Sequence, residues 1–262
     1  MRIFIADDMA TFDTGHFVTE IDPRFEQALN AIASEAKPED SFALLVIGHG
    51  SFDGTDYKLN IPGPDITAKE IAHLLNAIPA RRQLVVNMTS CSGASIPALV
   101  RKDRIVITAT KSGTEKNATI FARYWVDALK DPGADTDKNG TVSALEAFRY
   151  AQSKVAAYFE SEKLLATEHP LLADSGSVDA VRDPKPENGQ GLKAAAFPVM
   201  RAEVEAKSVA PAKQKLVTRK EDLEARIDRL KYQKAAMSPD EYKQQLTQLL
   251  LELAKTQAEI DR

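Results

Sequence analysis

The chain has 262 residues, of which 44% are apolar, and a formal net charge of −4. This length and composition allow one sizeable core with a small appendage, and the mild acidity argues against nucleic acid or an anionic membrane surface as the main partner. No apolar stretch approaches the roughly 20 residues of a membrane span, and the apolar start at residues 1–5 is too short for a signal peptide.

In chain order, short apolar runs alternate with helical patterns. Strands are expected at residues 2–6, 42–47, 83–88 and 104–109, because each run is brief and continuously apolar. Helices are expected at residues 23–36, 67–77, about 115–130 and 143–164. The second helix begins with the capping-box pair Thr67 and Glu70. Such alternation predicts an α/β fold, with a mostly parallel sheet covered by helices on both faces.

The C-terminal part of the chain changes character twice. Residues 183–215 are rich in proline and glycine and predict a linker, or a strand or two within a loop. Residues 216–262 place leucine and isoleucine at helical spacing on either side of a turn at Ser238 and Pro239, which predicts a helical hairpin. The hairpin either packs on itself or its own domain, or serves as a coiled coil for self-association or a protein partner.

His49 and Cys91 stand out as candidate chemical groups. His49 lies between two glycines after the strand at 42–47, and Cys91, the only cysteine, follows the strand at 83–88. Neighbouring parallel strands end at one edge of a sheet, so the two side chains could meet there. A thiol attacks as the thiolate, which a histidine can generate, and the N–H of Gly50 could stabilise an oxyanion. The alternative is a buried inert thiol and an ordinary loop histidine.

Five segments in a fixed order, spanning roughly residues 40–180, resemble one known family. They are LLVIGHGS, IPGPDITAKEIAHLLNAI, LVVNMTSCSGAS, RIVITATKSGTEKN and TEHPLLADSG. The set is similar to the caspase-fold (clan CD) cysteine peptidases, and within them to bacterial members of the legumain-like branch. The resemblance implies a three-layer α/β/α caspase-like fold over residues 1–182, followed by the linker and the C-terminal helical hairpin.

The same resemblance implies a function and roles for three residues. His49 would be the general base or acid, Cys91 the nucleophile, and the N–H groups of Gly50 and Cys91 an oxyanion hole. The reaction would be hydrolysis of a peptide bond in a protein or peptide substrate, through a thioester acyl-enzyme and without a cofactor for the chemistry. The dyad could also serve a transpeptidase, in which an amine resolves the acyl-enzyme. The remaining alternatives are a catalytically inactive, calcium-binding scaffold and a partner-binding protein.

The chain departs from the family at two places. Thr89 occupies the position at which legumains carry an acidic residue for substrate asparagine, so the resemblance does not extend to that specificity. Weak candidates for a specificity role at the same edge are Asp7, Asp8, Lys111, Ser112 and Glu115. The family has two strands before the histidine strand, and residues 2–6 resemble the second. We therefore expect the central first strand to be missing and a longer N-terminus to exist, which could carry a signal for export to the periplasm or the outside.

Residues 135–146, DTDKNGTVSALE, fit the calcium-loop pattern D-x-[DN]-x-[DN]-G-x₅-E without a mismatch. Side-chain oxygens would come from Asp135, Asp137 and Asn139, a carbonyl oxygen from Thr141, and a bidentate carboxylate from Glu146. Gly140 would form the sharp turn, and Ser143 would cap the following helix. Because Pro132 and Gly133 interrupt the incoming helix, we expect an EF-hand-like loop with a structural Ca²⁺ ion. The alternative is a polar turn before a capped helix.

Overall fold

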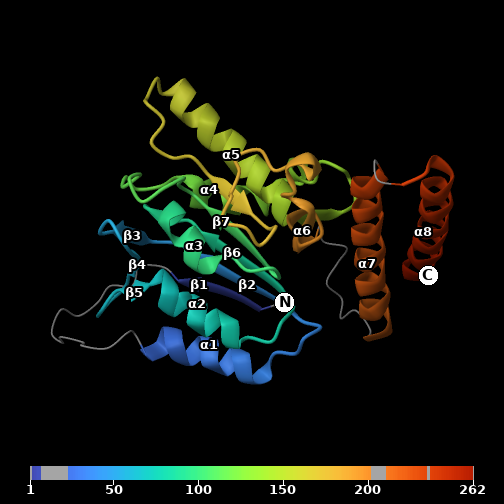
Figure 1. The fold of residues 1–262 in the computed structure, drawn as a ribbon, viewed down its shortest axis with the longest axis horizontal. Helices are drawn as coiled ribbons and strands as arrows, with labels where there is room; N and C mark the ends of the chain where they lie inside the picture. Colours follow the sequence, from blue (N-terminus) through green and yellow to red (C-terminus); the bar gives the residue numbers. More distant parts are fainter. Residues whose placement is uncertain (1, 7–22, 202–210, 235–236, 262) are drawn as a thin grey trace.

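The fold is given by a computed structural model that describes residues 2–6, 23–201, 211–234 and 237–261 (Figure 1). Its centre is a five-stranded sheet with the strand order β1-β2-β6-β7-β9. These strands are β1 (Arg2–Ala6), β2 (Ser41–Val46), β6 (Arg82–Asn87), β7 (Arg104–Thr108) and β9 (Leu171–Ala173). The first four are parallel and β9 is antiparallel to β7, so the predicted mostly parallel sheet is confirmed.

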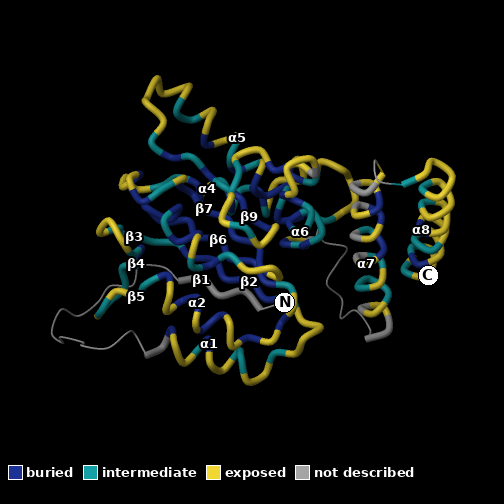
Figure 2. The backbone as a smooth tube through the Cα atoms, in the orientation of Figure 1, coloured by how far each residue is buried: buried dark blue, intermediate teal, exposed yellow. Residues whose placement is uncertain are grey.

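Helices cover both faces of the sheet and make three layers (Figure 1). One face carries α1 (Pro23–Glu35), α2 (Ala68–Ala77) and the short α3 (Ile96–Leu99), and the other carries α4 (Phe121–Ala128) and α5 (Ala144–Ser161). Successive strand residues point to opposite faces. In β6, Leu84 and Val86 therefore belong to the core under α4 and α5, while Val85 belongs to the core under α1 and α2. Figure 2 shows the burial concentrated between these layers.

The N-terminal strand β1 lies directly beside β2, the strand that leads to His49. All five residues of β1 are in parallel register with β2, from Arg2 opposite Phe42 to Ala6 opposite Val46. The expectation that a central strand is missing between them is therefore wrong, because β1 itself occupies that place. The order of strands in a sheet depends on long-range pairing, and the local sequence of β1 contains no information about its neighbour.

Two local predictions can be compared with the helix ends. The capping box expected at Thr67 and Glu70 of α2 is confirmed, and so is Ser143 as the N-cap of α5. Glu146 completes a capping box with Ser143 that was not predicted. The helix expected at about 115–130 begins only at Phe121, so that prediction is wrong at its start. The Glu168 carboxylate accepts hydrogen bonds from the backbone N–H groups of Ile120 and Phe121, each at 2.8 Å, and thereby fixes the first turn of α4.

Residues 183–201 are packed on the α/β domain, so the linker expected at 183–215 is wrong for this part, whereas the alternative of a strand within a loop is confirmed by β10. The segment contains η3 (Pro186–Asn188), α6 (Leu192–Ala195) and β10 (Pro198–Arg201). The Asp174 carboxylate accepts hydrogen bonds from backbone N–H groups at the start of α6. Phe197 is buried in the core under α4 and α5, and β10 pairs antiparallel with β8 (Thr141–Ser143). Residues 202–210 lie outside the described residues.

The predicted helical hairpin is confirmed and consists of α7 (Pro211–Gln233) and α8 (Pro239–Ile260), which lie side by side (Figure 1). Leu223, Ile227 and Leu230 of α7 pack against Leu249 of α8. Leu251 on α8 remains exposed, and self-association or a partner for the hairpin stays a prediction. Across the described residues, no helix has both the length and the apolar character needed to cross a membrane.

Candidate active site and acidic loop

The histidine and cysteine segments meet at the carboxyl edge of the central sheet. The ladder between β2 and β6 runs to Val46 opposite Asn87 and continues with a 2.9 Å hydrogen bond from Met88 N to Val46 O. Beyond it, Ser90 Oγ accepts a hydrogen bond from Gly50 N at 3.2 Å and donates one to Gly50 O at 2.8 Å. The residue after His49 is thus joined to the residue before Cys91.

His49 begins the first strand of a second, antiparallel sheet. Its strands are β3 (His49–Phe52), β4 (Tyr57–Asn60) and β5 (Ile66–Thr67). His49 is exposed, whereas the following Gly50 lies against residues 89–95, the segment around Cys91 that is here called the cysteine turn. A Cβ atom at Gly50 would lie only 2.6 Å from the Ser90 carbonyl oxygen and 2.7 Å from Thr89 Oγ1. The close approach of the two segments therefore requires glycine at this position.

Cys91 has a left-handed backbone, with φ 57° and ψ 6°, immediately before the 3₁₀ turn η1 (Ser92–Ser95). For a residue with a side chain this conformation costs roughly 1–2 kcal/mol. Hydrogen bonds hold the turn in place, including Ser95 Oγ to Ser92 O at 2.6 Å and Asn87 Nδ2 to Ser95 Oγ at 3.1 Å. Backbone strain of this kind is common at functional sites.

The Cys91 thiol is buried in the observed conformation. The residue is 1% exposed and belongs to the apolar cluster that includes Ile96 and Leu99. Burial raises the pKa of the thiol, while the charge of Lys116 acts in the opposite direction. This burial agrees with the alternative of a buried thiol, and a nucleophile at Cys91 would have to become accessible to a substrate.

Both N–H groups expected to form an oxyanion hole already have partners. Cys91 N donates to the carbonyl oxygen of Glu115 at 2.8 Å, and Gly50 N donates to Ser90 Oγ. The hydrogen bond between Cys91 N and the Glu115 carbonyl forms because residues 111–116, which follow β7, fold back over the cysteine turn. A Cβ atom at Gly93 would lie 2.2 Å from the carbonyl carbon of Lys111, so the two backbones touch there.

Glu115 and His169 form a pair that links this folded-back chain to the start of β9. The Glu115 carboxylate contacts His169 Nδ1 and accepts hydrogen bonds from Lys111 N at 2.8 Å and His169 N at 3.2 Å. No role could be assigned to His169 from the sequence, and Glu115 was only a weak specificity candidate. The one signal that could have found the pair is that both residues lie in two of the five segments on which the sequence resemblance was based.

The remaining residues near the edge have structural contacts. Thr89 is fully buried, and its Oγ1 lies 2.7 Å from Tyr57 OH and 2.8 Å from Asn87 Oδ1, so it lines no open pocket. Burial raises the pKa of Tyr57 to about 12, and the phenol is therefore a neutral member of this network. Asp7 and Asp8 lie outside the described residues.

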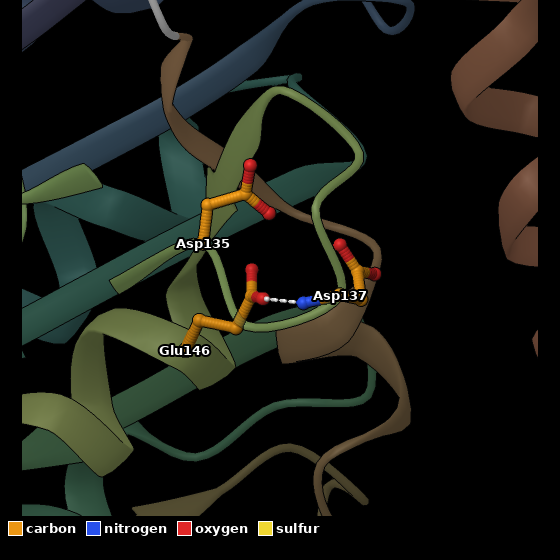
Figure 3. A group of neighbouring side chains, drawn as sticks. All are labelled: Asp135, Asp137 and Glu146. Atoms are coloured by element: carbon orange, nitrogen blue, oxygen red, sulfur yellow. Dashed lines mark hydrogen bonds between the residues drawn. The ribbon is translucent and has the colours of Figure 1, made fainter. Parts of the chain in front are cut away.

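The acidic loop brings three carboxylates together. One ligand oxygen from each of Asp135, Asp137 and Glu146 lies within 4.8 Å of the others, and this group could hold a metal ion (Figure 3). The loop follows η2 (Pro132–Ala134) and leads into β8. Gly140 has φ +82°, which supplies the expected sharp turn. Asp135 accepts hydrogen bonds from Asn139 N at 3.1 Å and Gly140 N at 2.9 Å.

Glu146 closes the acidic loop and caps α5 at the same time. One of its oxygens accepts from Thr136 N at 2.8 Å and Asp137 N at 3.3 Å, and the other accepts from Ser143 N at 2.9 Å. Burial, together with the nearby charges of Glu146 and Asp135, raises the pKa of Asp137. A bound cation would act in the opposite direction, so the donor set suits a positive ion.

Comparisons with known proteins define no family for this chain. No family model matches it, and no curated protein matches it. Among solved structures, the crystal structure of protein GSU0716 from Geobacter sulfurreducens is 13% identical, with a TM-score of 0.42. The similarity covers 66% of this chain and 77% of that one. The function of this protein must therefore be argued from its own residues.

Proposed function

We propose that this protein is a cysteine endopeptidase of the legumain-like, caspase-fold type, with His49 and Cys91 as a catalytic dyad. The observation that carries the proposal is the double hydrogen bond between Ser90 and Gly50, which joins the histidine strand to the cysteine turn. The strained backbone of Cys91 and the close approach at Gly50 support it, because strain of this kind is common at functional sites and the approach brings the residue after His49 against the turn at Cys91.

In this mechanism, the imidazole of His49 takes the proton of the Cys91 thiol, and the thiolate attacks the carbonyl carbon of the scissile peptide bond. The oxyanion that forms accepts hydrogen bonds from Gly50 N and Cys91 N, once those groups exchange their present partners for it. The imidazolium then protonates the leaving amine as the C–N bond breaks, leaving a thioester on Cys91. A water molecule deprotonated by His49 hydrolyses the thioester, which releases the acid and restores the thiol.

The test combines a peptide library with thiol labelling. Wild type should cleave a subset of the peptides, whereas Cys91→Ala should cleave none. Labelling of Cys91 by iodoacetamide should slow about tenfold or more in His49→Ala, because the neutral thiol is a poor nucleophile. The matched control is His73→Ala, since His73 is an exposed histidine on α2. Absence of cleavage in wild type, with labelling equally fast in His49→Ala, would overturn the proposal.

An inactive scaffold is the second candidate, and it is favoured by a specific observation. Cys91 is almost fully buried, and the N–H groups of Gly50 and Cys91 are already hydrogen-bonded. If the protein is an inactive scaffold, iodoacetamide should label Cys91 slowly, and at the same rate in wild type and in His49→Ala. The transpeptidase alternative shares the dyad and differs only in the acceptor. A ligated product in the presence of an added amine would distinguish it from hydrolysis.

The metal proposed for the acidic loop is Ca²⁺ in a structural role. The ligands would be the side-chain oxygens of Asp135, Asp137 and Asn139, the carbonyl oxygen of Thr141, and the Glu146 carboxylate, an all-oxygen set that suits this hard cation. Support comes from the convergence of the three carboxylates and from the pairing of β8 with β10, which fixes the backbone at Thr141. The ion would stabilise the loop and take no part in the dyad chemistry.

A further inference from the structure

The segment Lys111–Lys116, here called the strap, lies over the cysteine turn. Its residue Glu115 places a backbone carbonyl oxygen 2.8 Å from Cys91 N. In the proposed peptidase this N–H is one of the two that the substrate oxyanion needs. We propose that the strap is an autoinhibitory element, latched by the Glu115–His169 pair, and that it must open before a peptide can reach Cys91. This inference rests on the proposed function.

The carbonyl contact is the first step of the argument. A carbonyl oxygen of the substrate and the carbonyl oxygen of Glu115 compete for the same donor, because one N–H group makes one strong hydrogen bond. The contact between the strap and Gly93 also leaves no room for a chain on that side of the turn, since a Cβ atom at Gly93 would lie 2.2–2.6 Å from atoms of Lys111 and Ser112. A bound peptide therefore requires the strap to move.

The latch is the second step. Glu115 is only 9% exposed, and its carboxylate contacts His169 Nδ1, His169 N and Lys111 N, with Lys111 Nζ at 3.7 Å. Hydrogen bonds that involve a charged group are stronger than neutral ones, and they are stronger still away from water. The neighbouring Glu168 fixes the start of α4 through Ile120 N and Phe121 N. The chain between Glu115 and Phe121 is thus held at its first end by His169 and at its second end by Glu168.

The third step is that the strap also contacts the histidine side of the site. A Cβ atom at Gly113 would lie 2.2 Å from Cδ1 of Phe52, which is the last residue of β3, the strand that begins with His49. The strap therefore touches the cysteine turn at Gly93 and strand β3 at Phe52. Its movement would uncover the two halves of the dyad together, as a gate over this site should.

The test measures how fast iodoacetamide labels Cys91 in the full-length protein. Glu115→Gln keeps the size of the side chain but removes its charge, and His169→Phe removes the partner. Each should speed labelling about tenfold or more, because the lost interactions are charge-assisted. Glu162→Gln is the matched control, an exposed glutamate outside the latch, and it should label like wild type. Circular dichroism before labelling identifies any variant that has lost its fold.

Amide hydrogen exchange of wild type provides a second measurement that needs no variant. If the strap opens as a unit, Cys91 N–H should exchange at the rate of the strap amides of Lys111 and Glu115, faster than the amides of β6. Exchange of Cys91 as slow as β6, together with unchanged labelling in both latch variants, would overturn the strap. Labelling does not require peptidase activity. Faster labelling without cleavage would defeat the proposed function alone, and efficient cleavage with unchanged labelling would defeat the strap alone.

Discussion

The hydroxyl of Ser90 exchanges two hydrogen bonds with the backbone of Gly50, accepting from its N–H at 3.2 Å and donating to its C=O at 2.8 Å. A single side chain thereby joins two segments that are 40 residues apart in the sequence. The contact fixes the residue after His49 against the residue before Cys91, and its consequences for stability and for the reactivity of Cys91 can both be measured.

Ser90→Ala should lower the free energy of unfolding by about 1–3 kcal/mol, because the partly buried N–H and C=O of Gly50 lose their partner. Urea denaturation measures this change. Ser161→Ala is the control, since the Ser161 hydroxyl makes one exposed hydrogen bond to Tyr158 O. In Ser90→Ala, labelling of Cys91 should also depend less on His49. Equal stability of the two variants would show that the Ser90 contact contributes nothing.

Gly50→Ala should also destabilise the protein, by about 1–3 kcal/mol, because the new methyl group meets the Ser90 carbonyl oxygen and the ring of Tyr57 at 2.6 Å each. Gly133→Ala offers a comparison. Its added carbon would lie 3.1 Å from a carboxylate oxygen of Asp131, an exposed side chain that can move away. Chemical denaturation should therefore rank Gly50→Ala well below Gly133→Ala in stability. The reverse order would contradict the close approach of the two segments.

Glu168 should make stability depend on pH. Burial raises the pKa of its carboxyl from 4.5 to about 7, although the N–H groups of Ile120 and Phe121 favour the ionised form. The folded protein keeps this proton up to about pH 7, whereas the unfolded chain releases it near pH 4.5. The contribution to stability is therefore present below pH 4.5 and is lost as the pH rises toward 7, by roughly 3 kcal/mol.

The variant Glu168→Gln isolates that contribution, because glutamine does not ionise. Urea denaturation between pH 4.5 and 8 should show wild type losing stability relative to Glu168→Gln as the pH rises. Glu162→Gln, an exposed control, should run parallel to wild type. Parallel curves for all three proteins would mean that Glu168 titrates normally in the folded state.

Calcium at millimolar concentration should raise the melting temperature of wild type, because a ligand that binds only the folded state stabilises it. Asp137→Asn removes one of the three converging carboxylates and should abolish most of that rise. Asp103→Asn, which changes an exposed aspartate far along the chain from the loop, should respond like wild type. Isothermal titration that detects no heat of binding at millimolar calcium would remove the site.

Four strands of the central sheet and the N-caps of α2 and α5 were predictable because their signals are local, whereas the short strands β3, β4, β5, β8 and β9 were not predicted. Continuous apolar runs identified β2, β6 and β7 to within a residue at each end, and the capping boxes at Thr67 and Ser143 each lie within four consecutive residues. The late start of α4 was not predictable, because its first N–H groups are held by Glu168, more than 40 residues later. The same is true of the strap, whose contacts with Gly93 and His169 join distant segments.

Composition misled only the linker prediction at residues 183–201, since the alternative of a strand within a loop agrees with β10. Proline and glycine there are as frequent as in a linker, but backbone N–H groups of Gly191 and Ala194 are held by the buried carboxylate of Asp174. A single buried acid can order such a segment, and its partner atoms are backbone groups that every sequence has. The position of β1 was missed for a related reason, since pairing with β2 uses backbone hydrogen bonds.

The oxygens of the Glu146 carboxylate already accept hydrogen bonds at the positions that a metal ion would use. The two oxygens offer about four lone-pair positions, yet five donors already contact them: Thr136 through N and Oγ1, Asp137 through N, and Ser143 through N and Oγ. An arriving cation must displace some of these donors, so its entry is an exchange reaction and its net affinity is the difference between two sets of bonds. If the displaced donors are those of Ser143, the exchange would also weaken the cap of α5, and ion binding would then be coupled to the start of a core helix.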